Sequence, residues 1–482
     1  MKKNSLTTAV VAGIAGVAGF AGLANAVELN PDGLGQVLIY PYYTVNKSQD
    51  SLFSVVNTTE VGKAVKVRFL EGYNSREVLD FNLFLSPNDV WTARVSEIGN
   101  GDGAGMFTDD SSCTAPPIPA GGVAFRAAAY DGSSVFPKDS GPQGVERTRE
   151  GYLELIEMGE IIPGSPLDDA TIHDQDGTPN GGVPGCGAAV SGNNPAPYLS
   201  APGGGLFGSG AIVNVGEGTF FAYNADAIDG FSDTNIFSGP GGLTPSLQQA
   251  NTPLTSAFVG GAVAYIFANG SLLTLDYPNG IDAVSAVYQA DAIYNEYLTV
   301  AGLGANTDWV VTFPTKRFYV DTFFNGGAVI PPFSENFAGG ASFVEVGINM
   351  YDQEEGFTTQ PEDFSPPISE RPSALPYEVN VISFLTDTAA EDPSGVFGSV
   401  LRANIVPYGD AGWLRLDLAS GDGGHSMRPA GNGVVMHGLP TTGFEAYNII
   451  NANAQPGMLA NYGGLFRHRA SRSCTGVDPA CS

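Results

Sequence analysis

Histidine, basic side chains and short catalytic motifs are scarce or absent in this chain, and each shortage argues against a class of protein. The four histidines are His173, His425, His437 and His468. They form no H-E-x-x-H pattern and no pair at helical spacing, which gives a zinc hydrolase little support and favours surface or structural roles. No G-x-x-x-x-G-K-S/T phosphate loop and no G-x-S-x-G nucleophile elbow occurs. With 21 basic against 50 acidic residues, the net charge of −29 should repel nucleic acid.

Cysteine is sparse as well. The four residues are Cys113, Cys186, Cys474 and Cys481, and no C-x2-C pair is present, which argues against a cysteine metal site. A small, even set of cysteines in an exported chain is typical of disulfides, for which three connectivities are possible. We favour Cys113–Cys186, which would close a loop-rich insertion, and Cys474–Cys481, which would close a short loop near the C-terminus.

Long apolar runs are missing except near the N-terminus. Lys2 and Lys3 precede an apolar stretch from Ala9 to Leu23, and Ala24-Asn25-Ala26 is a small-x-small sequence. This order is typical of a signal peptide and predicts cleavage after Ala26. The apolar stretch is shorter than the ~20 residues that span a bilayer, which disfavours a membrane anchor. We therefore expect an exported protein with no transmembrane segment of its own, located outside the cell, at its surface, or in the periplasm.

Strand patterns account for most of what is present. Short segments rich in β-branched and aromatic residues recur between turns, and several alternate with a period of two. These segments are Gln36–Val45, Ser51–Val56, Ala64–Leu70, Leu79–Leu85, Arg149–Ile162 and Trp413–Leu418. The 64 glycines and 33 prolines indicate many turns and few long helices. The sequence therefore predicts a mainly β protein of antiparallel β-sandwich domains, immunoglobulin-like or jelly-roll-like, with long loop insertions and one or two short helices.

The length of 482 residues exceeds one ordinary core and predicts more than one domain. We expect a signal peptide over 1–26, an N-terminal β-sandwich domain over 27–238, and a β-rich C-terminal domain over 243–482. The boundary is placed at Gly239-Pro240-Gly241-Gly242. A loop-rich insertion is expected around 99–210, comprising loops over Gly99–Pro119 and 163–210. The three-to-four-residue spacing of apolar residues predicts a helix over Ile281–Leu298, and a shorter helix is predicted over Phe444–Ala452.

Acidic loops are the best candidates for a bound ion. Asp174-Gln175-Asp176-Gly177 places two carboxylates before a glycine turn, as calcium loops do, although the twelve-residue EF-hand pattern is incomplete. Asp102, Asp109 and Asp110 form a second acidic loop, and both loops also fit ordinary turns. The sequence thus predicts no obligatory cofactor, with Ca²⁺ at Asp174 and Asp176 as an option.

Two further sequence patterns are candidates for a binding or catalytic site. Gly203, Gly205 and Gly208 form a G-x-G-x-x-G string, but no strand precedes it and no helix follows it, so a flexible loop is expected instead of a dinucleotide site. Glutamate pairs such as Glu154 with Glu157, or Glu354 with Glu355, could serve glycoside hydrolysis, yet sequence spacing does not give their separation in space. No catalytic residue is therefore nominated.

Four segments resemble proteobacterial exported proteins that carry only the label "cell surface protein". They are Ser75–Ala93, Arg149–Gly159, Asp308–Asp321 and Leu459–Cys474. The resemblance spans most of the chain beyond Ala26, implies a role at the cell surface, and brings no catalytic residue with it.

These observations favour a secreted or cell-surface structural or adhesive protein without catalytic activity, whose partners are surface components or other copies of itself. One alternative is an outer-membrane β-barrel, which shares the signal peptide, the acidity and the aromatic content. The prolines and cysteines of this chain, and its polar end at Ala480-Cys481-Ser482, argue against a barrel. The other alternative is a secreted polysaccharide-active enzyme.

Overall fold

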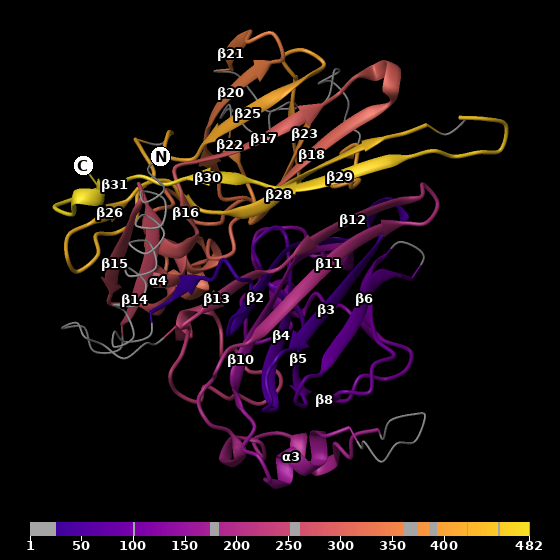
Figure 1. The fold of residues 1–482 in the computed structure, drawn as a ribbon, viewed down its shortest axis with the longest axis vertical. Coiled ribbons are helices and arrows are strands. Elements are labelled where there is room, and N and C mark those ends of the chain that lie inside the picture. Colours follow the sequence, from indigo (N-terminus) through magenta and orange to yellow (C-terminus); the bar gives the residue numbers. More distant parts are fainter. Residues whose placement is uncertain are drawn as a thin grey trace, which may run out of the picture.

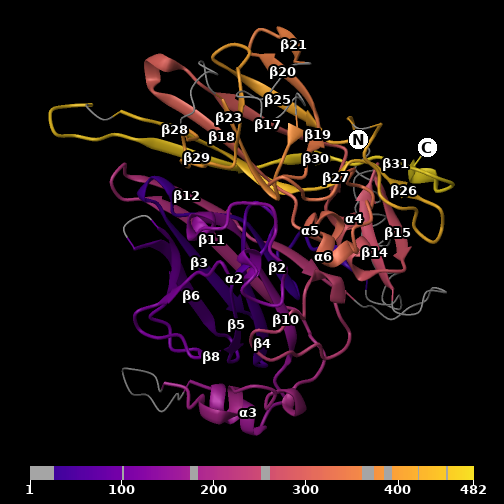
Figure 2. The ribbon, with the colours of Figure 1, turned by 180° about the vertical axis from the view of Figure 1, so that it is seen from behind.

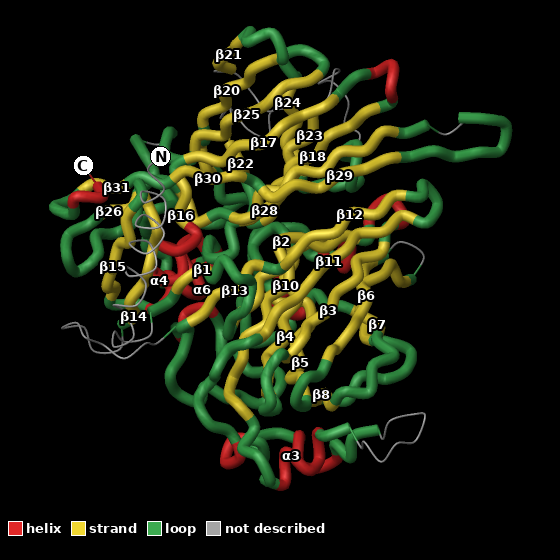
Figure 3. The backbone as a smooth tube through the Cα atoms, viewed as in Figure 1, coloured by secondary structure: helices red, strands yellow, loops and turns green. Residues whose placement is uncertain are grey.

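Two β-sandwiches make up most of the computed structural model, which describes residues 26–99, 102–173, 183–250, 261–360, 374–384, 393–421, 423–451 and 454–481 (Figure 1). The N-terminal sandwich consists of a seven-stranded and a six-stranded sheet, and the C-terminal sandwich of two five-stranded sheets. Strand is the dominant structure throughout (Figure 3). The predicted fold class, mainly β with antiparallel sandwiches, is confirmed.

The N-terminal sandwich uses thirteen strands from residues 28–229. Its seven-stranded sheet contains, in spatial order, β1 (Glu28–Leu29), β13 (Asp226–Asp229), β2 (Val37–Thr44), β10 (Glu150–Glu160), β4 (Lys63–Glu71), β5 (Glu77–Leu85) and β8 (Cys113–Ala115). Its six-stranded sheet contains β12 (Thr219–Asn224), β11 (Leu206–Asn214), β3 (Asp50–Asn57), β6 (Val90–Ile98), β7 (Gly103–Phe107) and β9 (Val123–Ala124). Every pair in both sheets is antiparallel.

The C-terminal sandwich uses strands from residues 292–471. One sheet contains β21 (Phe357–Gln360), β20 (Gly347–Asp352), β25 (Ala411–Asp417), β17 (Ala292–Leu298) and β30 (Arg469–Ser471). The other contains β24 (Arg402–Ile405), β23 (Val379–Phe384), β18 (Ala305–Thr312), β28 (Thr442–Ile449) and β29 (Tyr462–Arg467). The pair β23–β24 is parallel, and the other pairs of these two sheets are antiparallel.

Smaller elements fill the side of the molecule near both ends of the described chain (Figure 1). The hairpin β14 (Ala262–Ala268) and β15 (Ser271–Tyr277) packs against α4 (Gly280–Tyr288). Two-stranded pairs join β16 (Gln289–Ala290) to β27 (Leu439–Pro440), β19 (Val344–Glu345) to β22 (Ala374–Leu375), and β26 (Val435–Met436) to β31 (Cys474–Thr475). The other α-helices are α2 (Ala128–Asp131), α3 (Pro166–Thr171), α5 (Arg317–Val320) and α6 (Thr322–Asn325), each one or two turns long. Turns of 3-10 helix lie at Asn46–Ser48, Val145–Arg149, Gly187–Val190, Ala196–Tyr198, Leu247–Gln249, Ala301–Leu303 and Pro479–Cys481. No helix in the described part of the chain is long and apolar enough to cross a membrane.

The predicted strand over Arg149–Ile162 is confirmed as β10, which lies between β2 and β4. Ten of its eleven residues are buried, because both faces of the sheet are covered at this position. Strands buried on both faces carry near-continuous apolar runs instead of strict alternation. The sequence of β10 departs from such a run only at Glu150, Glu154, Glu157 and Glu160, and each of these carboxylates has a polar partner.

Both helix predictions need correction. Over Ile281–Leu298 the helix ends at Tyr288, and Ala292–Leu298 forms strand β17. Ile293, Asn295 and Tyr297 alternate as buried residues in that strand, so the same sequence fits periods of two and of nearly four. The predicted helix over Phe444–Ala452 is wrong, because Thr442–Ile449 forms β28, whose neighbours in the sheet are β18 and β29. In both segments tertiary pairing outweighs a weak local helical pattern.

The expected loop over Gly99–Pro119 contains strands β7 and β8. The β7 sequence, GAGMF, lacks the usual strand formers, but its small residues fit a crowded place between β6 and β9. A Cβ atom on Gly105 would lie only 3.1 Å from the carbonyl oxygen of Val123. Close packing of backbones is thus a physical reason for glycine in this strand. Because glycine is also typical of turns, the composition of the segment wrongly predicted a loop.

The segment 163–210 carries α3 before it enters β11. A disulfide between Cys113 and Cys186 ties it to the edge strand β8, with a Cα–Cα distance of 5.5 Å. A second disulfide joins Cys474 to Cys481. This is the connectivity favoured from the sequence.

One apolar core runs through both sandwiches and the α4 region. Polar contacts reinforce the junction between the sandwiches. The Thr312 hydroxyl donates to the Pro41 carbonyl (2.7 Å), and the Ser399 hydroxyl donates to the Glu150 carboxylate (2.6 Å). These contacts bridge sequence separations of about 250 or more residues, so polar contacts as well as the shared apolar core join the two sandwiches.

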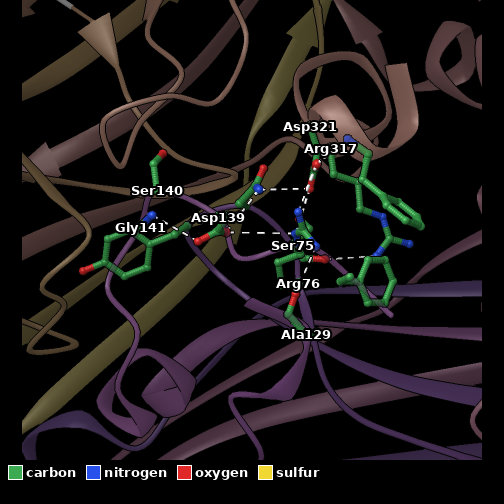
Figure 4. Close-up of polar contacts among 12 residues, drawn as sticks. Ser75, Arg76, Ala129, Asp139, Ser140, Gly141, Arg317 and Asp321 are labelled. Atoms are coloured by element: carbon green, nitrogen blue, oxygen red, sulfur yellow. Dashed lines mark hydrogen bonds and ion pairs between the residues drawn. The ribbon is translucent and has the colours of Figure 1, made fainter. Parts of the chain in front are cut away.

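A further buried contact joins the turn after β4 to the short helices α5 and α6, which lie at the junction in the rear view (Figure 2). Figure 4 shows Arg76 reaching across it to Asp321, with an Nη2–Oδ1 distance of 3.0 Å. The same guanidinium donates to the Ala129 carbonyl, and Arg317 donates to the Ser75 carbonyl at 3.1 Å. All five of these residues are more than 90% buried, and Ala129 and Ser75 contribute their backbone carbonyls. The junction is therefore fixed by ionic contacts as well as by apolar packing.

Candidate functional site

The predicted calcium ligands Asp174 and Asp176 lie outside the described residues. In the described ranges, no group of three or more His, Cys, Asp or Glu residues could hold a metal ion. In the second acidic loop, Asp110 accepts hydrogen bonds from the backbone of Thr92 and from both the backbone and the hydroxyl of Ser112. Asp110 thus acts as a turn residue. Ala26, the predicted cleavage position, is the first described residue, and Val27 after it pairs with Ala264.

The histidines make local polar contacts. His425 is buried, with its ring nitrogens 3.0 and 2.9 Å from the carbonyl oxygens of Pro332 and Glu345. His437 contacts the Ser426 hydroxyl, and His468 contacts the Val310 carbonyl. Burial lowers the pKa of His468 to about 3. His173 contacts the hydroxyls of Ser86 and Ser111. These contacts fit the structural roles expected from the sequence.

The G-x-G-x-x-G string binds a carboxylate of the protein itself. The backbone N–H groups of Gly203 and Gly204 donate to Glu157 at 3.1 and 2.8 Å. Lys63 donates to the same carboxylate at 3.0 Å and to Glu160 at 2.7 Å. Burial raises the pKa of Glu157 to about 7, against the opposing effect of Lys63. The glycines therefore satisfy an internal charge and leave no free anion-binding loop at this position.

Sequence reasoning missed a layer of buried ion pairs on the outer face of the seven-stranded sheet. The alternation of β4 correctly separates Val65 and Val67 from Lys66 and Arg68, but the polar face is buried too. Arg68 donates to Glu77 at 2.6 Å and to Glu154 at 3.1 Å.

Residues 232–250 lie over this face, and we call them the covering segment. They include the predicted boundary Gly239–Gly242. The Gly239 and Gly242 carbonyls accept from Lys66 and Arg68, respectively, and the Gly241 N–H donates to Asp80. A glycine-rich stretch leaves its backbone groups accessible to such partners. The stretch predicted as a domain boundary is therefore part of the packed structure, and nothing in its composition distinguishes a boundary from a packed segment.

The glutamate pairs named as candidates for hydrolysis are either bound to cationic side chains or exposed to solvent. Glu154 accepts from Arg68 and Arg317, and Glu157 is held by Lys63, so both are structural. Glu354 and Glu355 lie exposed in the turn after β20.

The described surface also has two openings, and neither of them was predicted from the sequence.

The first opening, called the outer groove, crosses the solvent-facing side of the six-stranded sheet and has a volume of about 530 Å³. The strand register places Phe107, Arg94, Leu52, Ala211 and Ala222 directly opposite one another across five strands. Directly opposite residues share one face of an antiparallel sheet. The groove is thus a continuous row of side chains from β7 to β12.

The outer groove is apolar and exposed. Leu52 is 38% exposed and Phe220, at its β12 edge, 61% exposed. Its charged lining residues are Arg94 and Asp109, and the Arg94 guanidinium lies over the Phe107 ring, 4.4 Å from its centroid. A face of this kind has the properties of a surface that binds an apolar partner.

The second opening, called the carboxylate cavity, lies in the C-terminal sandwich and has a volume of about 600 Å³. The carboxylate and aromatic side chains that line it include Glu296, Asp352, Trp413, Glu445, Tyr447 and Phe466. Glu296 lies opposite Trp413 across β17 and β25, and Trp413 lies opposite Tyr351 on β20. The Trp413 and Tyr351 rings stack with centroids 4.2 Å apart and planes 7° apart. One face of the indole is therefore covered by Tyr351.

Glu445 is the unusual residue of the carboxylate cavity. It is only 2% exposed, and its Oε2 atom has no hydrogen-bond partner among the described residues. Burial and, to a smaller extent, the charge of Glu296 raise the pKa of Glu445 to about 8. A buried carboxyl group without a compensating partner is costly to ionise, and such groups concentrate at functional sites.

The raised pKa of Glu445 predicts a pH-dependent loss of stability. The folded state retains a proton that the unfolded chain releases near its ordinary pKa of 4.5, so stability falls as pH rises from there to about 8. Glu445→Gln should therefore melt at the same temperature as the wild type at pH 4 and at least ~3 °C higher at pH 9. Thermal melts at the two pH values measure this, with the exposed Glu354→Gln as the control. Equal melting temperatures of Glu445→Gln and wild type at pH 9 would contradict the assignment.

Taken together, the sheets, the disulfides and the two openings define a protein of two packed β-sandwiches with an opening on each. No protein-family model, no curated protein and no solved structure matches the chain.

Proposed function

We propose that this chain is a secreted or cell-surface structural or adhesive protein without catalytic activity, and that the outer groove is its adhesive surface. The observation that carries the proposal is the row of exposed and half-buried side chains across five paired strands, which is apolar except for Arg94. These strands already have their hydrogen-bond partners, so the exposed face adds an unfavourable contact with water and no structural benefit. Binding of a partner would remove that contact.

Three independent features support a location outside the cytoplasm. The segment from Lys2 to Ala26 has the composition of a signal peptide. The two disulfides are stable in oxidising compartments. Finally, four segments resemble exported cell surface proteins, as described above.

The partner that fits the outer groove is an apolar component of the cell surface. A second copy of the chain is less favourable, because each copy carries a net charge of −29 and copies repel one another at long range. The scarcity of charge in the groove itself also selects against strongly ionic partners.

A charged substitution in the groove tests the proposal. We expect Leu52→Lys to move the protein from the sheared surface fraction of the producing cells into the medium, with retention falling at least about 10-fold, the equivalent of 1.4 kcal/mol. Val215→Lys is the matched control, since Val215 is 82% exposed in the turn between β11 and β12 and does not line the groove. Immunoblots of surface, medium and cell fractions give the result. Retention of Leu52→Lys equal to that of Val215→Lys would refute the role of the groove, and sedimentation velocity would reveal self-association instead.

A further inference from the structure

The carboxylate cavity combines three features that point to one class of ligand. Glu296 and Glu445 approach it from β17 and β28, and the charge of Glu296 acts on Glu445. The aromatic side chains of Trp413, Tyr447 and Phe466 line the same space. In the described part of the chain, no lysine or arginine lines this cavity. Two carboxylates in an aromatic cavity therefore lack the cation that would neutralise them.

The neighbouring buried carboxylates show how the fold treats such groups elsewhere. Glu154 has Arg68 and Arg317 within 3.3 Å, and Glu71 has Arg147 at 2.7 Å. Glu445 is buried to a similar degree and its Oε2 atom, like that of Glu154, has no hydrogen-bond partner, but among the described residues no lysine or arginine lines the cavity that Glu445 faces. Glu445 lines the wall of the cavity. The contrast indicates that the missing partner is not part of the folded sandwich.

We propose that the carboxylate cavity binds an organic cation, a primary ammonium or a guanidinium group, between Glu296, Glu445 and the Trp413 ring. An ammonium group would form charge-assisted hydrogen bonds with both carboxylates. The Trp413 face that Tyr351 leaves uncovered offers a cation–π contact, for which indole is the best of the aromatic rings. The net charge of −29 raises the local concentration of cations around the protein.

A divalent metal ion fits the same site less well. Ca²⁺ takes six to eight oxygen ligands, and the third carboxylate of the cavity, Asp352, already accepts from the backbone N–H groups of Glu354 and Gly356. The volume of about 600 Å³ and the aromatic walls also suit an alkyl-bearing cation better than a bare ion.

Binding should release a proton at neutral pH. The titratable groups that line the cavity together with Glu445 are Glu296, Asp352, Tyr297 and Tyr447, and none of them is a base. A cation placed beside Glu445 favours its ionised form and displaces the proton that burial retains. Calorimetry in two buffers of different ionisation enthalpy would measure this release, which a purely structural carboxyl group would not produce.

Two probes distinguish the sources of such a cation. N-acetyl-lysine amide represents a basic side chain of a partner protein, and 1,4-diaminobutane represents a free amine. Tighter binding of the lysine derivative indicates a protein partner, and tighter binding of the diamine indicates a free polyamine. Either result supports the proposal, because both place an ammonium group in the cavity.

The decisive experiment is isothermal titration of the full-length exported protein at pH 8 with butylammonium, with 1-butanol as the neutral probe of the same shape. We expect one site for butylammonium, none for butanol, and at least a ten-fold weaker affinity in Glu296→Gln, in Glu445→Gln and in Trp413→Leu. Glu354→Gln should bind as the wild type does, and melting at pH 4 verifies that each variant is folded. Equal affinity for butanol, unchanged affinity in both glutamine variants, or displacement of butylammonium by equimolar Ca²⁺ would overturn the proposal.

Discussion

Replacing Arg147 with methionine should lower the free energy of unfolding by about 3–5 kcal/mol, because the change leaves the buried Glu71 without its cation and leaves Asp139 with only the longer ion pair to Arg76, at 4.0 Å. Arg147 donates to Glu71 through Nε (2.7 Å) and Nη2 (2.9 Å), and to Asp139 through Nη1 (2.8 Å) and Nη2 (2.7 Å). Its side chain is fully buried, and its guanidinium lies 4.3 Å from the centre of the Tyr130 ring. Methionine retains the apolar volume but provides no charge.

The effect should extend to the junction between the sandwiches. Glu71 also accepts from the backbone N–H groups of Tyr73, Asn74 and Arg76, so it fixes the turn from which Arg76 reaches Asp321. Loss of the Arg147 charge therefore weakens the turn that holds the two halves together.

Urea unfolding followed by tryptophan fluorescence measures the difference. The matched control is Arg415→Met, which removes an exposed pair with Asp417 at 3.3 Å and should cost less than about 1 kcal/mol. If the two variants lost the same stability, the ion pairs at Arg147 would not be the source of the effect.

The sequence predicted most of the strands because their patterns are local. Alternation identified β25, where Leu414 and Leu416 are buried and Trp413 is exposed, and residue types identified β2 and β10. The prediction of one helix was wrong for the segment that forms α4 and then β17, because its tyrosines fit both a helical face and a strand face. Which period prevails depends on β25 and β30, which lie far from β17 in the sequence.

The sites could not be predicted, for a related reason. Glu296 and Glu445 are 149 positions apart in a chain with 50 acidic residues, and only the fold brings them to one cavity. Similarly, Lys66 and Arg68 look like an ordinary solvated face until the covering segment is placed over them. The outer groove is formed by register across five strands, and each strand alone shows only a few apolar residues on its outer side. Burial of charge and assembly of a face are properties of the tertiary structure.

The disulfides, in contrast, were predictable, and they should contribute unequally to stability. Cys113 and Cys186 are 73 positions apart, whereas Cys474 and Cys481 are 7 apart. A cross-link reduces the entropy of the unfolded chain more when it closes a longer loop, which gives about 4 kcal/mol for the first bond and about 2.5 kcal/mol for the second. Substituting both cysteines of a pair with alanine should therefore destabilise the protein more at Cys113–Cys186.

Local packing strengthens this expectation. Cys113 is 1% exposed in the edge strand β8, and it belongs to a small apolar cluster with Phe84, Met158 and Leu167 beneath the segment that carries α3. Removal of the bond frees that segment from the sheet edge and also raises the conformational entropy of the unfolded chain. Urea unfolding of the two double-alanine variants under non-reducing conditions decides the order. A larger loss in Cys474→Ala/Cys481→Ala would mean that native packing around the short loop, and not loop entropy, determines what each disulfide contributes.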